Sequence, residues 1–475
     1  MQTEKEPKLS GQFLTVDDGA VINLSSVTSM WRDKAGLFGR GDDRLRFSFC
    51  GEDYKRPMND GRITALFNKL VDDGSFVAIG DELINTSTLQ SLWYDSGKLY
   101  YQQAGDDGSV RMPPNEAEQI FDKLLEQKKF MRIADEVVNM NKVVNAWFEE
   151  AGWLSSDKLR LNFIGDSSTT IYVDQRQAKD AMDQFAKRPH FAEIGGEIVN
   201  VAMAGNVWLS GKKLHISYPG TSCTIHMGSE TGRHLYDVFD EKFGFHEVGD
   251  ELLNGNMVSS ADATKGGWFS SDRVRYKILR DYGSISENYK DAQSLVDSFA
   301  AQDNYVEIEG DVLNINSLSS IYYDGKKLRI AQGTETESWR MDQLAAEEII
   351  AKVLKDEKFV EMDGGAYNIE MAVEYSYEDG ALHMNIGRDT EEIQMSPQQA
   401  EKILDIIRDY GMKRHEESLK RRTDINEVEA DAVWSPDMLA DLYAEISREQ
   451  NQAMMNAAVV LTVINASNTT TSTIN

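Results

Sequence analysis

The chain has 475 residues and carries 79 acidic against 50 basic side chains, for a net charge of −29. Its length is too great for one hydrophobic core and predicts roughly three or four domain-sized bodies. The acidic excess argues against nucleic acid and anionic membranes as partners, because both repel a negative surface. The two cysteines, Cys50 and Cys223, form no disulfide framework. Neither a signal peptide nor a run of ~20 apolar residues is visible, so we expect a soluble cytoplasmic protein.

An aromatic residue followed nine positions later by an asparagine recurs along the whole chain, with one extra residue in the first copy. Turn residues such as Gly80-Asp81 lie midway, and the flanking residues alternate, so each copy predicts a β-hairpin. We expect the asparagine to end the second strand by bonding nearby backbone in an Asx-turn, with a row of ligand-contacting asparagines as the alternative. The seven pairs are Phe13/Asn23, Phe76/Asn85, Phe130/Asn139, Phe191/Asn200, Phe245/Asn254, Tyr305/Asn314 and Phe359/Asn368.

Two further strands, a fifth strand and an amphipathic helix follow each hairpin. In the last copy Ser396 to Gln399 forms a capping box with proline at the first helical position, and apolar residues follow at helical spacing. The predicted fold is therefore α+β. It is a tandem array of seven small units, each with about five antiparallel strands and one C-terminal helix, followed by a helical tail.

Long and short copies alternate, and the extra residues fall in the turn between the third and fourth strands. The long turns cover residues 36–46, 152–160 and 267–275, whereas short copies have tight turns such as Gly97-Lys98. A single unit of ~55 residues buries too little surface to be stable alone, so we expect long and short copies to pair. The predicted domains are double repeats at 11–129, 130–244 and 245–358, then a seventh single repeat at 359–411.

The remaining segment, 412–475, differs in composition. Lys413 to Asp431 is densely charged and predicts an exposed linker or a solvated helix, and Ser435-Pro436 opens a second helix. The last residues are rich in Thr, Ser and Asn. This tail could cover the seventh repeat as a cap, or it could dock on a partner.

The long turns are the best candidates for a binding site, because each combines large apolar residues with basic ones in an otherwise acidic protein. Tryptophan and arginine on loops are the residue types that dominate binding hot spots. The alternative is that Trp153 and Trp268 pack between repeats. The candidate residues are Leu37, Phe38, Arg44, Trp153, Leu154, Lys158, Arg160, Trp268, Phe269, Arg273 and Arg275.

Catalytic and cofactor motifs are missing from the sequence. It contains no glycine-rich phosphate loop, no nucleophile elbow and no helix-borne pair of histidines. Cys223 and His226 are one loose pair, whereas zinc needs four convergent ligands. We therefore expect no enzyme activity, no cofactor and no bound metal.

The leading hypothesis is a non-enzymatic scaffold that binds a protein partner through the long turns. One alternative is an acidic mimic that inhibits a DNA- or RNA-binding enzyme. Another is a structural subunit of a larger assembly. A ring around DNA is a fourth, which the acidic balance disfavours because such a channel should be basic.

Overall fold

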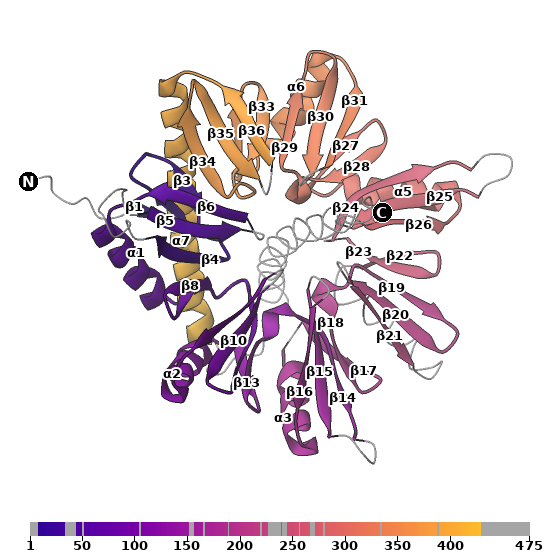
Figure 1. Ribbon diagram of the computed structural model, residues 1–475. Coiled ribbons are helices and arrows are strands. Elements are labelled where there is room, and N and C mark those ends of the chain that lie inside the picture. Colours follow the sequence, from indigo (N-terminus) through magenta and orange to yellow (C-terminus); the bar gives the residue numbers. More distant parts are fainter. Residues whose placement is uncertain are drawn as a thin grey trace, which may run out of the picture. The chain divides into compact units, whose positions relative to one another are not determined.

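A computed structural model gives the fold. It describes residues 8–33, 44–49, 52–103, 106–151, 156–164, 167–188, 190–218, 221–226, 239, 245–255, 257–266, 271–278, 281–332, 335–386 and 389–428. Seven separate antiparallel sheets account for the strands, and six α-helices are described (Figure 1). We number the sheets 1 to 7 in chain order.

The first four sheets contain the following elements. Sheet 1 has β4 (Ser29–Asp33), β5 (Arg44–Phe49), β6 (Glu52–Pro57), β7 (Phe76–Ile79) and β8 (Glu82–Asn85), with helix α1 (Asp60–Asp72). Sheet 2 has β9 (Leu89–Asp95), β10 (Lys98–Gln103), β11 (Asp106–Arg111), β12 (Phe130–Ile133) and β13 (Glu136–Asn139), with α2 (Pro114–Leu125). Sheet 3 has β14 (Val143–Glu149), β15 (Lys158–Phe163), β16 (Ser167–Tyr172), β17 (Phe191–Ile194) and β18 (Glu197–Asn200), with α3 (Gln175–Ala186). Sheet 4 has β19 (Asn206–Ser210), β20 (Lys213–Tyr218), β21 (Thr221–His226), β22 (Phe245–Val248) and β23 (Glu251–Asn254).

The last three sheets follow the same plan. Sheet 5 has β24 (Val258–Thr264), β25 (Arg273–Ile278), β26 (Asp281–Ser286), β27 (Tyr305–Ile308) and β28 (Asp311–Asn314), with α5 (Tyr289–Ala300). Sheet 6 has β29 (Ser320–Tyr323), β30 (Lys327–Gln332), β31 (Glu335–Arg340), β32 (Phe359–Met362) and β33 (Gly365–Asn368), with α6 (Gln343–Val353). Sheet 7 has β34 (Glu374–Glu378), β35 (Ala381–Ile386) and β36 (Asp389–Gln394), with α7 (Pro397–Val428) and three N-terminal strands, β1 (Lys8–Ser10), β2 (Phe13–Thr15) and β3 (Val21–Asn23).

The array predicted from the sequence is confirmed at the level of repeated five-stranded sheets, and sheet 7 has a sixth strand. The helix expected in the fourth copy would fall in residues 227–244, of which only Phe239 is described. The capping box of the last copy is confirmed, because Gln399 N donates to Ser396 Oγ and Ser396 N donates to Gln399 Oε1. Helix α7 continues into the charged segment and ends at Val428. The predicted helix at Ser435-Pro436 and the Thr-rich end lie outside the described residues.

Each of sheets 1 to 6 takes strands from two consecutive sequence copies. Sheet 1 has the order β6-β5-β4-β8-β7, so the hairpin that opens the next copy pairs back onto β4. Sheets 2 to 6 repeat this order, which means that the hairpin completes a sheet rather than starting one. The first hairpin, β2–β3, has no earlier copy to join, and it pairs with β34 in sheet 7 through Val21 and Ile22 (Figure 1).

The spacing of aromatic and asparagine follows from hairpin register. The two residues lie directly opposite each other at the open end of every hairpin, as Phe76 does with Asn85 and Tyr305 with Asn314. Nine residues apart is therefore the separation of the terminal pair in a four-residue hairpin with a two-residue turn. In the first copy Phe13 faces Asn23 across the longer turn.

All seven asparagines are buried, with at most 4% of the side chain exposed. The predicted Asx-turn is confirmed in five copies, whereas Asn200 Oδ1 has no hydrogen-bond partner among the described residues. Asn85 Oδ1 accepts from the backbone N of Ser87 at 2.9 Å, and four other copies make the same bond.

The other end of the amide joins neighbouring copies, a contact that local sequence could not reveal. Six of these asparagines have a described bond from Nδ2 to a backbone carbonyl in the turn that follows the asparagine of the preceding copy. The acceptors are Ala372 O for Asn23 (3.3 Å), Val27 O for Asn85 (2.7 Å), Val143 O for Asn200 (3.1 Å), Ala204 O for Asn254 (2.8 Å), Val258 O for Asn314 (3.2 Å) and Leu318 O for Asn368 (3.0 Å). We call these contacts the asparagine ladder. Asn23 bonds to the turn after Asn368, so the first copy contacts the seventh copy in the way that the other copies in the ladder contact the one before them.

The chain divides into two compact units. The first holds sheets 1, 6 and 7, and the second holds sheets 3, 4 and 5 with most of sheet 2. In the second unit one apolar cluster runs from Val144 of sheet 3 through Val207 of sheet 4 to Val312 of sheet 5. Successive sheets therefore share a core. The grouping of copies into double repeats stays a prediction.

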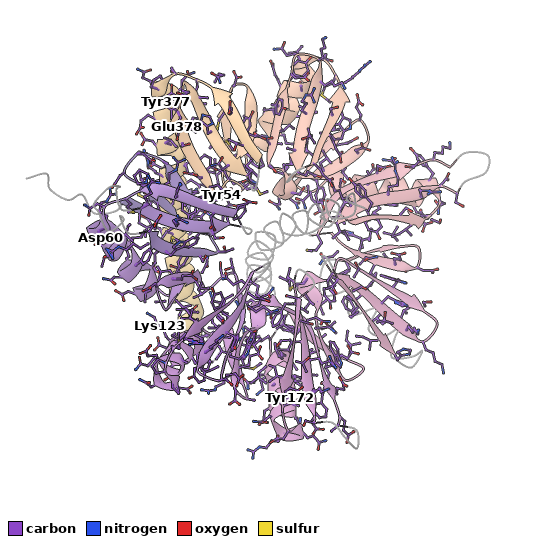
Figure 2. All side chains as sticks on the ribbon, viewed as in Figure 1. Tyr54, Asp60, Lys123, Tyr172, Tyr377 and Glu378 are labelled. Carbon is purple, nitrogen blue, oxygen red and sulfur yellow. The ribbon has the colours of Figure 1, made fainter. Side chains whose placement is uncertain are left out.

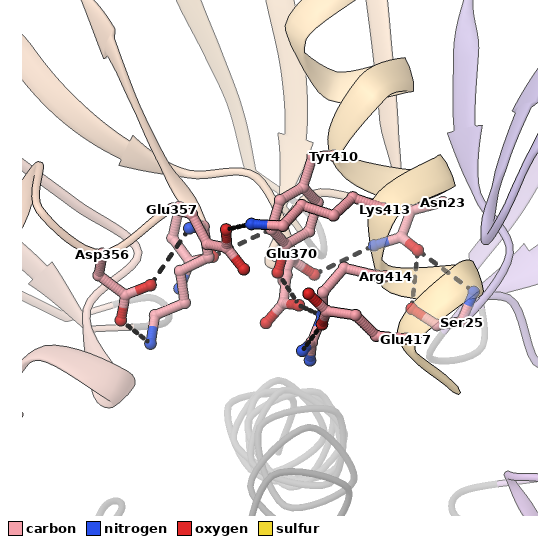
Figure 3. A network of polar contacts seen from close by, with 11 residues as sticks. Asn23, Ser25, Asp356, Glu357, Glu370, Tyr410, Lys413, Arg414 and Glu417 are labelled. Atoms are coloured by element: carbon pink, nitrogen blue, oxygen red, sulfur yellow. Dashed lines mark hydrogen bonds and ion pairs between the residues drawn. The ribbon is translucent and has the colours of Figure 1, made fainter. Parts of the chain in front are cut away.

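In the first unit, α7 secures the shared sheet. Ile403 and Ile407 pack in the core of sheet 7 with Phe13 of the N-terminal hairpin. Tyr410 Oη donates to Glu370 Oε1 at 2.5 Å, and Lys413 pairs with Glu357 (Figure 3).

The turn between β1 and β2 lies against the backbone of α7. Gly11 adopts φ +59°, and a Cβ added to it would overlap the carbonyl of Gly411. A Cβ added to Gly411 would in turn overlap the carbonyl oxygen of Ser10 and the ring of Phe13. Both positions therefore need glycine, one for its backbone conformation and both for the close approach.

Sheets 7 and 1 are also joined by charge. Arg56 of β6 pairs with Glu374 and, at 3.1 Å, with Glu378, which is labelled in Figure 2. Arg56 also lies 3.3 Å from Asp18 in the β2–β3 turn, while Asp17 accepts from the backbone N of Asn59 at 3.0 Å. Because Glu374 and Arg56 are largely buried, this ion pair depends on both partners being present.

We expect Asn85→Ala to lower the free energy of unfolding by about 2–4 kcal/mol, because it removes bonds to buried carbonyls of Leu24 and Val27. Asn68→Ala, on the exposed side of α1, is the matched control and should change stability little. Chemical denaturation of the full chain measures both. Equal stability of the two variants would contradict the ladder's role.

Gly411→Ala should cost about 1–3 kcal/mol, because the methyl group has no space against β1 and β2. Thermal unfolding gives the loss, and faster hydrogen exchange in Phe13–Thr15 should accompany it. Met412→Ala, at a side chain that is 45% exposed, serves as the control. Unchanged exchange in β2 would show that the helix does not hold the hairpin.

Candidate functional site

The three long turns occupy the same place in alternate sheets. They join β4 to β5, β14 to β15 and β24 to β25, the first and second strands of sheets 1, 3 and 5. In the short copies the same two strands are joined by tight turns, such as Ser96-Gly97 between β9 and β10. The predicted location of the extra residues is thus confirmed.

The apolar candidates at the tips lie outside the described residues. The basic candidates lie on the strands that follow the turns. Arg44, Lys158 and Arg273 are each the first residue of the second strand, opposite Asp33, Glu149 and Thr264 respectively. The candidates without a described position are Leu37, Phe38, Trp153, Leu154, Trp268 and Phe269.

Carboxylates pair with basic residues two positions further along these strands. Arg160 donates to Glu149, and Arg275 donates to both oxygens of Asp262 at 2.9–3.1 Å. The hydrogen bond from Arg160 lowers the pKa of Glu149, and the bond to Asp262 raises the pKa of Arg275. In sheet 1 the equivalent pair is Arg46 with Asp33, at 3.0 Å. These pairs join the two strands on either side of each long turn. Arg44 and Arg273 are not part of these pairs and lie two residues nearer to the turn.

An aspartate braces the base of two long turns. Asp157 Oδ1 accepts from the backbone N of Ala151 at 2.7 Å, and Asp272 Oδ1 accepts from Gly266 N at 2.6 Å. Asp272 Oδ2 also accepts from the backbone N of Tyr289 at the start of α5, at 3.0 Å. The sequence carried the signal, because a Ser-Ser-Asp triplet ends both turns, but these aspartates were not among the candidates.

A row of half-buried aromatic and basic residues also escaped the sequence analysis. Trp31, Trp93, Trp147 and Trp208 each lie eight residues after one of the seven recurrent asparagines. On one side each tryptophan faces a glutamate at the start of the hairpin's second strand. On the other side the partner is Arg46 for Trp31, Arg160 for Trp147 and His215 for Trp208. The glutamates are Glu82, Glu136, Glu197 and Glu251.

Ring stacking orders this row in the short copies. Trp93 stacks on Tyr100 with centroids 5.3 Å apart, and Trp208 stacks on His215 at 4.9 Å. In sheet 3, Tyr172 on the edge strand is 66% exposed and lies opposite Lys158 (Figure 2). Sheet 3 therefore has an exposed tyrosine, a lysine and a Trp–Arg pair on adjoining strands. These are residue types typical of protein-binding surfaces.

Metal ligands do not gather in the described part of the chain, where no three His, Cys, Asp or Glu side chains could hold one ion. Nor does any helix among those residues combine the length and apolar character needed to span a membrane.

Asp272→Ala should lower stability by about 1–2 kcal/mol, since two backbone N–H groups lose a charged acceptor. The local effect should be larger, with faster proteolytic cleavage between residues 266 and 272. Ser271→Ala, at an exposed neighbour, is the control. If both variants are cleaved at the wild-type rate, the aspartate does not brace the turn.

Comparisons with known proteins give no family. No protein-family model matches the chain, and no curated protein matches it. Among solved structures, the LytTr DNA-binding domain of a Bacillus cereus response regulator aligns with 17% identity and a TM-score of 0.18. That alignment covers 23% of this chain and 93% of the other. A TM-score this low carries no argument about fold or function.

Proposed function

We propose that this protein is a non-enzymatic cytoplasmic scaffold that binds a protein partner through the long turns of sheets 1, 3 and 5. The observation that carries the proposal is the recurrence of one arrangement in these sheets. Each has an inserted turn, a basic residue where the next strand begins, and an arginine–carboxylate pair beneath it. In other repeat proteins, insertions at equivalent places in the repeats likewise form loops on one face, which is often the binding face.

The residues beside the turns support recognition of a protein. Trp147, Arg160 and Tyr172 supply large, half-buried or exposed side chains of the kinds that dominate interface energies. The arginines beside the turns, Arg160 and Arg275, are already paired with carboxylates, which fixes their side-chain positions before a partner arrives. Pre-ordered side chains lose less entropy on binding.

Site-specific photo-crosslinking tests the proposal. A photoreactive amino acid replaces Arg44, Lys158 or Arg273 in three separate variants, which are exposed to cell lysate and irradiated. The matched controls carry it at Lys98, Lys213 or Lys327, each the first residue of the same strand in a short copy. We expect one protein to be crosslinked from the long-copy positions and not from the controls.

Other outcomes discriminate among the hypotheses. Equal crosslinking from long and short copies, or none from either, would contradict binding through the long turns. If the crosslinked protein binds nucleic acid and added DNA or RNA displaces this chain from it, the acidic-mimic hypothesis gains the support instead.

A further inference from the structure

Three successive joints in the second unit contain a carboxylate at the same position. Glu136, Glu197 and Glu251 are the first residues of β13, β18 and β23, the second strands of their hairpins. Each lies where its own sheet meets the next one. Glu136 is buried, with 7% of its surface exposed, and the other two are half-buried.

Neutral groups face Glu136 at the joint between sheets 2 and 3. Its Oε2 accepts from Thr169 Oγ1 of β16 at 3.4 Å, and its Oε1 has no hydrogen-bond partner among the described residues. Burial raises the pKa of Glu136 to about 7, although the hydroxyls of Ser91 and Thr169 oppose the shift. No charged side chain contributes to that pKa.

Glu197 lies close enough to Tyr218 and Cys223 of sheet 4 for its charge to act on both groups. Burial raises its pKa, opposed by a hydrogen bond from Asn145 of its own sheet. Burial and then the charge of Glu197 also raise the pKa of the Cys223 thiol to about 12, so that group stays neutral. The Tyr218 hydroxyl, fully buried, likewise keeps its proton.

Glu251 faces sheet 5. Its Oε2 accepts from Asn206 Nδ2 at 3.1 Å, and the same nitrogen lies 3.1 Å from Tyr276 Oη of β25. Burial raises the pKa of Glu251, and the neighbouring Asp250 adds to the shift, whereas Asn206 and Tyr276 oppose it. The groups that face it across the joint are therefore neutral, and its one charged neighbour is acidic.

None of the three glutamates makes an ion pair within the described residues. Glu374 in the first unit differs, because Arg56 neutralises it. An ionised carboxylate that is buried without a cation is costly, whereas the protonated form is neutral and can donate a hydrogen bond.

We propose that the joints between sheets 2, 3, 4 and 5 form a proton-controlled device, in which protonation of Glu136, Glu197 and Glu251 tightens the packing of the sheets and ionisation loosens it. For a carboxyl group whose folded pKa is raised, the folded state holds a proton that the unfolded chain releases. The stability that the protonated carboxyl contributes is fully present below about pH 4.5, the ordinary pKa of a glutamate side chain. For Glu136 it is lost as the pH rises to about 7.

Thermal unfolding between pH 5 and pH 8 tests the proposal on the full chain. Wild-type Tm should fall over this range by about 5 °C more than that of the triple variant Glu136→Gln, Glu197→Gln, Glu251→Gln. Glutamine keeps the shape of the protonated side chain and cannot ionise. Hydrogen exchange in β16, β21 and β25 should quicken with pH in the wild type more than in the variant, beyond the intrinsic pH dependence of exchange.

The control is Glu193→Gln with Glu247→Gln, at exposed positions on the first strands of two of the same hairpins. It should retain the wild-type pH dependence. If the triple variant retains it too, or if the control loses it equally, the device does not exist. Should the triple variant fail to fold, Glu136→Gln alone decides the question, and an unchanged pH profile for that variant overturns the proposal.

Discussion

The amide of a buried asparagine is the interaction on which the rest of this structure depends. Each ladder asparagine must satisfy an acceptor and a donor in a place without water. In Asn85, for example, the oxygen closes the turn that follows it, and the nitrogen bonds to the corresponding turn of the preceding copy. Aspartate lacks the donor, serine lacks the reach and glutamine is one carbon too long for the Asx-turn. A residue that is locally a turn former is therefore also the connection between repeats.

This constraint explains why the structural repeat and the sequence repeat are out of phase. The hairpin that carries the asparagine must lie beside the turn of the preceding copy, so it joins that copy's sheet. Sheet 1 is consequently built from strands of the first and second copies, and the N-terminal hairpin has to find the seventh. The long helix α7, the glycine contact at Gly11 and Gly411, and the ion pair of Arg56 with Glu374 all act at that one place.

Local features of this fold could be predicted from the sequence, and contacts between copies could not. The spacing from Phe76 to Asn85 predicts a hairpin because both residues belong to one register. Nothing in a strand such as β8 says whether it will pair with the strand after it or with β4, more than fifty residues earlier, since its apolar pattern suits either sheet. The carbonyl that accepts from Asn85 Nδ2 could not be predicted from the sequence for the same reason, because it belongs to the preceding copy.

In the candidate site, too, single residues could be identified from the sequence, whereas contacts between strands could not. The basic residues Lys158 and Arg273 could be recognised as candidates, because long and short copies differ in length there. The sequence analysis placed both inside the long turns, whereas each is the first residue of a strand. The tryptophans eight residues after the asparagines were a readable signal, but Asp262, Tyr322 and Ser376 replace them in three copies. Their arginine partners, such as Arg160, lie on another strand, and only the register brings them together. The buried glutamates looked like the rest of an acidic surface.

The pairing of β3 with β34 also has a consequence for how the chain is made. About 350 residues separate Ile22 from its partner Glu374. At ribosomal rates of about 5–20 residues per second, the first hairpin leaves the ribosome roughly 20–70 seconds before the strand that completes its sheet. Throughout that time the edge of β3 offers unpaired backbone groups to any other strand nearby. Its shortness, three residues, limits the hydrogen bonds that a wrong partner could form.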